Sequence, residues 1–157
     1  MGVICVLIVV VSGFSGYYLT EKYRQRKVFY AELAKFVDYL ISNIKFMQTK
    51  TEKLFYDYKT TSKLFLKFKS EAVERLNNKK YKFTCLNFLS LTEINEVNLI
   101  LDNLGSLDLS GVISNLENAK ELIKSKTKQA ENEANIKVGL TLKLSIIFGL
   151  ALAIILI

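Results

Sequence analysis

Residues 140–157 read LTLKLSIIFGLALAIILI and residues 3–19 read VICVLIVVVSGFSGYYL, and these two stretches decide the fold. The first carries one charge, Lys143, and the second carries none. As a helix rising about 1.5 Å per residue, each would span roughly 26 Å, close to the hydrocarbon thickness of a bilayer. Neither shows the amphipathic stripe of a core helix in a soluble protein. We therefore predict a transmembrane helix at each end, over residues 1–19 and 140–157.

A cleaved signal peptide is the alternative interpretation of the first stretch. No Lys or Arg precedes the apolar run, and the Gly-Phe-Ser triplet at residues 13–15 is a poor cleavage site. Cys5 stands too close to the start to be a lipoprotein cysteine. We therefore expect residues 1–19 to remain as an anchor, with Tyr17 and Tyr18 at the membrane interface.

Basic residues cluster on the inner side of both predicted anchors. Lys22, Arg24, Arg26 and Lys27 follow the first, and Lys124, Lys126, Lys128 and Lys137 precede the second. Because cytoplasmic flanks of membrane helices carry the excess of Lys and Arg, residues 20–139 are expected in the cytosol. These cations would also attract anionic membrane lipid. Lys143 lies close enough to the boundary for its side chain to reach the headgroups.

The composition excludes several kinds of active site. The 157 residues have a formal net charge of +7 and contain no His, so no catalytic triad or zinc site that uses imidazole can form. The two cysteines, Cys5 and Cys85, cannot build a four-cysteine metal site. Acids such as Asp38 and Asp57 lie on helix faces with lysines nearby, as solvated faces do. We predict no enzyme activity, no catalytic residue, no cofactor and no metal.

The positive charge also raises the possibility of nucleic-acid binding. Residues 59–69, KTTSKLFLKFK, are the one candidate that interleaves cations with aromatics. Their apolar side chains are more simply explained as one buried helix face surrounded by lysines. No nucleic-acid partner is therefore expected.

A helical pattern follows the first anchor. Over residues 28–47 apolar side chains recur every three or four positions, which predicts an amphipathic helix. Residues 49–51 mark a break before a short helix. Thr61 or Ser62 is placed to cap the next helix, which should end near Asn77.

The following stretch is predicted to hold two more helices. Apolar residues over 81–89 indicate a short one, with Cys85 as a small core residue. Ser90-x-x-Glu93 fits a capping box and should open the second helix. Gly105 then stands where a left-handed C-terminal cap is wanted.

The last helix should start at about Leu109, after Asp108 or Ser110, and continue into the membrane. Residues 124–139 are almost wholly polar, and we interpret them as a solvated helical stalk. A coiled coil with a partner is the alternative, although the heptad fades. Residues 20–123 should form an antiparallel helical bundle, so the fold class is all-α.

The ending FGLALAIILI at residues 148–157, the polar helix before it and the Leu104-Gly105-x-x-Asp108 turn resemble the stage III sporulation protein AB family. The likeness covers the whole chain in layout, and its residue matches lie in the last third. Val112, where members often have Gln, and Ser145, where Gly is usual, depart from the family pattern.

The resemblance implies a helical cytosolic domain like that of type II secretion platform proteins, between two anchors. It implies a scaffold of the channel complex that joins mother cell and forespore in endospore formers, located in the mother-cell membrane. The implied partners are other membrane components of that complex and a cytosolic secretion-type ATPase.

Small residues recur at every fourth position in both predicted anchors. They are Ser12 and Gly16, and Ser145, Gly149 and Ala153. Such stripes allow close helix packing in membranes. They would close the two anchors of one chain or join neighbouring copies in a homo-oligomer, unless Gly and Ala are merely frequent there.

The turn at Leu104, Gly105 and Asp108 has two interpretations. Gly105 and Asp108 would cap the two helices, or the turn would contact the ATPase. As a whole, the chain is interpreted as a scaffold; a small regulatory or membrane-active, holin-like protein is the alternative.

Overall fold

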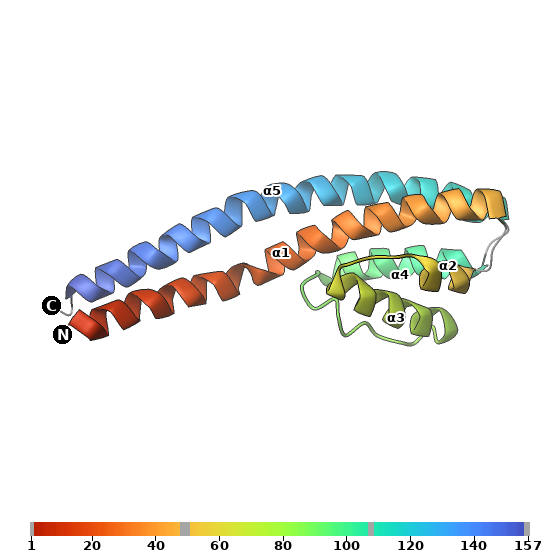
Figure 1. The fold of residues 1–157 in the computed structure, drawn as a ribbon. Helices are drawn as coiled ribbons and strands as arrows, with labels where there is room; N and C mark the ends of the chain where they lie inside the picture. The colour runs from red at the N-terminus through yellow and green to blue at the C-terminus, as the bar shows by residue number, and fades with distance from the viewer. Residues whose placement is uncertain (1, 48–50, 107–108, 156–157) are drawn as a thin grey trace. The chain divides into compact units, whose positions relative to one another are not determined.

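The computed structural model describes residues 2–47, 51–106 and 109–155, and within these ranges every regular element is a helix. The all-α prediction is confirmed for this part of the chain. In chain order the helices are α1 (Gly2–Met47), α2 (Thr51–Asp57), α3 (Lys63–Asn77), α4 (Leu91–Ser106) and α5 (Leu109–Ile155) (Figure 1). The absence of proline is consistent with two helices of 46 and 47 residues, because proline breaks helices.

The chain divides into two compact units. The terminal unit consists of residues 1–27 and 129–157, so it combines the beginning of α1 with the end of α5. The central unit is the continuous segment of residues 28–128 and holds the remainder of both long helices together with α2, α3 and α4.

Aromatic rings form the core of the central unit. Phe29 and Phe36 come from α1, Phe55 from α2, and Phe65 and Phe68 from α3, and all five are almost completely buried. The Phe36 and Phe55 ring centroids are 4.8 Å apart, and those of Phe29 and Phe68 are 5.1 Å apart, both edge to face. This arrangement adds a directional attraction to the burial of apolar area. The core therefore fixes α1, α2 and α3 against one another.

A serine cap starts α3. The Ser62 hydroxyl accepts a hydrogen bond from the Phe65 backbone N–H at 3.3 Å, so Ser62 rather than Thr61 is the cap. Just before the cap, the Thr60 hydroxyl donates a hydrogen bond to the Glu32 carboxylate of α1 at 2.6 Å. The helix ends at Asn77, where the sequence places its end.

The predicted helix over residues 81–89 is wrong, because this segment consists of extended chain and turns. Glu71 provides the reason. Its carboxylate accepts hydrogen bonds from the Thr84 backbone N–H at 2.8 Å, the Thr84 hydroxyl, and the Cys85 backbone N–H at 3.1 Å. A helix would direct these N–H groups elsewhere. Leu86 and Leu89 are still buried. The spacing of the apolar residues in this segment therefore indicates which side chains are buried, but it does not indicate a helix.

The capping box at the start of α4 is confirmed. The Glu93 carboxylate accepts from the Ser90 N–H at 3.0 Å, and the Ser90 hydroxyl accepts from the Glu93 N–H at 3.3 Å. The Tyr30 hydroxyl donates to the same carboxylate at 2.9 Å, which ties α4 to α1.

The predicted cap at Gly105 differs from the structure. Helix α4 continues to Ser106, so Gly105 lies in its last turn and not after it. A glycine inside a helix costs only about 1 kcal/mol relative to alanine, which allows the extra residues. Asp108 lies outside the described residues. Helix α5 begins at Leu109, the residue at which the sequence places its start.

Candidate functional site

The terminal unit brings the predicted small residues together within one chain. A Cβ atom added at Gly16 would lie 2.7 Å from the Cβ of Ser145. One added at Gly149 would lie 3.0 Å from the Cβ of Ser12 and 3.2 Å from the backbone Cα of Val9. Because real Cβ atoms do not approach so closely, glycine is needed at both positions for α1 and α5 to touch.

The seam between these helix segments is longer than the sequence predicts. Ala153 is buried, as are Thr20, Ala130 and Ala134, which were not among the predicted packing residues. Thr20 stands four positions after Gly16, as Gly16 stands four positions after Ser12, and this regular interval could have identified Thr20 from the sequence. The polar-looking residues 124–139 therefore have a buried face of alanines, where small side chains allow helices to approach.

The hydroxyl groups of Ser12 and Thr20 are bonded within α1. The Ser12 hydroxyl donates to the Val9 carbonyl at 3.1 Å, and the Thr20 hydroxyl donates to the Tyr17 carbonyl at 2.8 Å. Each hydroxyl is thus satisfied by its own helix. At Ser12 and Thr20, contact across the seam therefore depends on close packing and not on a hydrogen bond between the helices.

The outward faces of the terminal unit are apolar and exposed. Phe14 in α1 is 73% exposed, and Ile147 in α5 is 60% exposed. Among the described residues one helix, over Ser110–Ile155, is long and apolar enough to cross a membrane. The second predicted transmembrane helix, over residues 1–19, stays a prediction.

Two of the four predicted flanking cations are held by acids of α5. Arg26 forms an ion pair with Glu133, and the Lys27 ammonium lies 3.5 Å from the Glu131 carboxylate. These pairs lie beside the alanine part of the seam and join the polar parts of the two helices. The position of Arg26 in the sequence suggests a cation that faces lipid. In the structure Arg26 is instead bound to Glu133 of α5.

The other two flanking cations lie over aromatic rings. The guanidinium carbon of Arg24 is 4.2 Å from the centre of the Tyr17 ring. The ammonium groups of Lys22 and Lys137 lie 5.1 and 5.0 Å from the centre of the Tyr23 ring. Cation–π contacts of this kind hold a charge in place without neutralising it.

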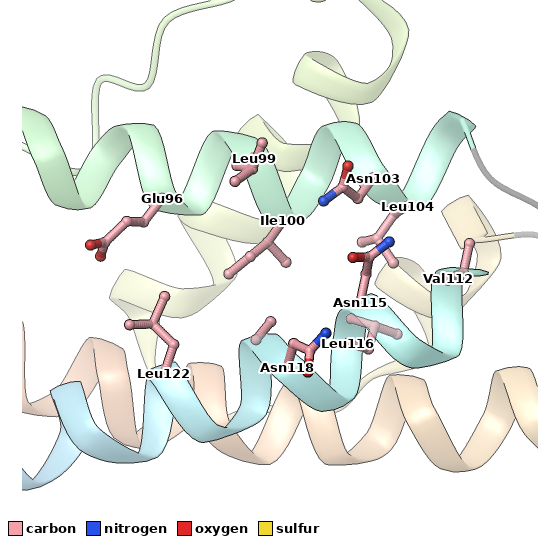
Figure 2. A pocket seen from close by; sticks show the side chains of 11 residues that line it. Glu96, Leu99, Ile100, Asn103, Leu104, Val112, Asn115, Leu116, Asn118 and Leu122 are labelled. Atoms are coloured by element: carbon pink, nitrogen blue, oxygen red, sulfur yellow. The ribbon is translucent and has the colours of Figure 1, made fainter. Parts of the chain in front are cut away.

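The central unit carries a groove between α4 and α5, with a volume of about 210 Å³. Figure 2 shows apolar side chains between the two helices, with asparagines toward one end and Glu96 at the other. Leu104, a predicted contact residue, lines the groove and is itself almost fully buried. Lys126 forms an ion pair with Glu96 at 2.9 Å. Of the three residues named for the predicted turn, Leu104 is therefore the one that the structure shows lining the groove.

Charged groups inside the central unit act as clamps between elements. Arg75 of α3 donates from Nε to Asn98 at 3.2 Å and from Nη2 to Asp102 at 3.0 Å, both on α4. Burial would raise the pKa of Glu71, but hydrogen bonds from Thr84 and Cys85 outweigh it and lower that pKa. These polar groups stabilise the fold, and neither Arg75 nor Glu71 lines the groove between α4 and α5.

Cys85 lacks the properties of a nucleophile. Its side chain is buried, and burial together with the neighbouring Glu71 carboxylate raises the pKa of the thiol to about 12. The thiolate, which is the reactive form, is therefore scarce at neutral pH. Within the described ranges no group of three or more His, Cys, Asp or Glu side chains is placed to hold a metal ion.

A family model described as stage III sporulation protein AB matches residues 2–157. Curated proteins gave no match, and neither did solved structures.

Proposed function

Because the chain belongs to the stage III sporulation protein AB family, which has a role in sporulation, we propose that it is a membrane-anchored scaffold of the channel complex between mother cell and forespore. In this proposal the terminal unit lies in the mother-cell membrane. The central unit lies in the cytosol and couples a secretion-type ATPase to the membrane rings. Other membrane proteins of the complex and further copies of this chain are the remaining partners.

The continuity of the long helices is the observation that supports this proposal best. Helix α5 runs without interruption from Leu109, in the central unit, to the apolar end at Ile155. Helix α1 likewise joins the aromatic core around Phe36 to the apolar face around Phe14. A chain built in this way can hold a folded domain at a membrane surface.

The chemistry of the central unit favours a scaffold over an enzyme. Its buried charges among the described residues are Lys69, Glu71, Arg75 and Glu93, and each is bonded to a group outside its own element. Cys85 is buried and protonated at neutral pH. Side chains committed to structural bonds are not available for acid–base or nucleophilic steps.

Membrane topology tests the first half of the proposal. Inverted vesicles from cells that express the full chain should expose residues 28–128 to added protease, whereas intact cells should protect them. An impermeant amine reagent gives a second readout, because Lys79 and Lys80 lie in an exposed turn. Labelling of these lysines in intact cells would contradict a cytosolic central unit.

Co-purification tests the second half. The full chain, solubilised in mild detergent from sporulating cells, should retain a cytosolic ATPase. The matched variants are Leu99→Glu, at the exposed edge of the α4–α5 groove, and Leu66→Glu, on the exposed face of α3. Loss of the ATPase in the first variant alone would assign it to the groove, and failure of the wild-type chain to retain it would contradict the coupling role. Permeabilised cells upon expression would favour the holin-like alternative.

A further inference from the structure

One side of the terminal unit carries an open apolar groove of about 540 Å³. Its lining includes Val9, Gly13 and Phe14 of α1, and Leu142 and Ile146 of α5. Gly13 is the position at which the groove has room, because a Cβ atom added there would meet nothing within 4 Å. Gly16 and Gly149 differ from Gly13, because at these two positions the opposite helix leaves no room for a side chain.

The length of the groove matches one leaflet of a bilayer. From Val9 to Tyr17 the α1 part of the lining covers eight residue steps, or about 12 Å. Half of a hydrocarbon core of about 30 Å is about 15 Å. A transmembrane helix of a neighbouring protein would follow the helix pair across both leaflets, whereas one acyl chain ends within one.

A cation stands where the groove ends. Tyr17 lines the groove, and the guanidinium of Arg24 lies over its ring with 4.2 Å between the guanidinium carbon and the ring centre. In the part of the chain that the structure describes, Arg24 has no carboxylate partner within 4.0 Å. The nearby acid Glu21 accepts a hydrogen bond from Gln25 at 3.1 Å. The Arg24 donors are therefore available to an anion from outside the chain.

We propose that this groove and Arg24 together bind one anionic phospholipid, with an acyl chain along Gly13 and the phosphate on the guanidinium. The proposal rests on the membrane placement of the terminal unit given under the proposed function. Arginine suits this role because its planar donor fork binds phosphate oxygens in pairs while its face stacks on an aromatic ring. Tyr17 is 52% exposed and holds the guanidinium at the interface depth that tyrosine prefers.

Native mass spectrometry of the detergent-solubilised full chain tests the site, with phosphatidylglycerol and phosphatidylcholine as probes. The wild-type chain should retain one phosphatidylglycerol in preference to phosphatidylcholine. Arg24→Gln should weaken phosphatidylglycerol retention about fivefold and remove the preference. Gly13→Phe should abolish retention of both lipids, because the ring would fill the groove. Inorganic phosphate in large excess should not displace the lipid, since it lacks the acyl chain.

Two substitutions serve as matched controls. Gly139→Phe adds the same ring at another glycine with open space, outside the lining of the groove. Lys22→Gln removes a cation that lies over Tyr23 instead of Tyr17. Both should retain phosphatidylglycerol as the wild type does.

The outcomes separate the lipid site from the membrane placement. Resistance to alkaline carbonate extraction of membranes reports the anchoring alone, and its loss would overturn the proposed function. With anchoring intact, equal lipid retention by wild type, Arg24→Gln and Gly13→Phe would overturn the lipid site. A dimer that Gly13→Phe dissociates, without any change in lipid retention, would assign the groove to a second copy and also overturn it.

Discussion

The terminal and central units bury different side chains. The central unit packs large rings, among them Phe36 and Phe65, and fixes its elements with charged clamps such as Glu71. The terminal unit packs the smallest residues, with Gly16 and Gly149 at the contacts, and leaves its large apolar side chains on the outside.

This difference is the one expected under the proposed function, which places the terminal unit in a bilayer and the central unit in water. In water, burial of a large apolar side chain contributes about 1.5–3 kcal/mol, so rings belong inside. In lipid that gain disappears, and helices associate through close packing, which small residues permit. Substitutions should therefore act oppositely in the two units: removing volume should damage the central unit, and adding volume should damage the terminal one.

The largest effect is expected from Phe65→Ala. Phe65 is fully buried and contacts the rings of Phe29, Phe36, Tyr58 and Phe68. The cavity and the lost burial should lower the free energy of unfolding by about 3–5 kcal/mol. Thermal unfolding of the full chain in mild detergent, followed by circular dichroism, measures this. Tyr56→Ala, at a ring that is 71% exposed, is the control and should change little.

A smaller loss is expected from Glu71→Gln. An amide presents one acceptor oxygen to donors that the carboxylate satisfies with two, so the unfolding free energy should fall by about 1.5–3 kcal/mol. Glu74→Gln, at an exposed position of the same helix, should leave stability unchanged. Equal stability of the two variants would show that the carboxylate is not the clamp that holds residues 84 and 85.

The Glu71 clamp should also depend on pH. Because the pKa of Glu71 is lower in the folded chain than in the unfolded one, its contribution is fully present above the unfolded pKa of about 4.3. It is lost as the pH falls through the lower, folded pKa. The stability difference between wild type and Glu71→Gln should therefore shrink upon acidification, and denaturation profiles from pH 7 to pH 3 would show this. A difference that stays constant would contradict the lowered pKa.

In the terminal unit, added volume should open the seam. Ser12→Cys with Gly149→Cys, in a Cys5→Ser background, should form a disulfide within one chain. The two Cβ positions are about 3.0 Å apart, and a disulfide needs about 3.8 Å, so the bond itself holds the helices together after the slight separation that the Cβ at position 149 requires. Addition of Gly16→Ile should reduce the cross-linking yield several-fold, whereas Gly13→Ile should not. Non-reducing gels distinguish the products, and a cross-linked dimer would show that the stripe joins neighbouring copies.

The smallest effect is expected from Lys120→Gln. The Lys120 ammonium lies 2.7 Å from Asp38, but both side chains are about half exposed. Exposed ion pairs contribute only about 0.2–1 kcal/mol, so the melting temperature should hardly move. A loss as large as that of Glu71→Gln would mean that surface charges stabilise the central unit as much as its buried clamp does.

The sequence by itself determined where most of the helices lie, including the starts of α3, α4 and α5 and the end of α3. The pattern of apolar residues and the caps at Ser62 and Ser90 act over a few residues, and no distant contact is needed to read them. The small residues Gly16 and Gly149 could be identified in the same way, since spacing on a helix is a local property.

Only the tertiary structure decided which residues face one another. The helix predicted over residues 81–89 failed because Glu71, thirteen positions before Thr84, binds that backbone. The partners of Gly16, Arg26 and Glu93 lie 63 to 129 positions away in the chain, and no local pattern encodes such distances. Periodicity shows that a face is buried, but packing selects what covers it, because many partners satisfy the same pattern.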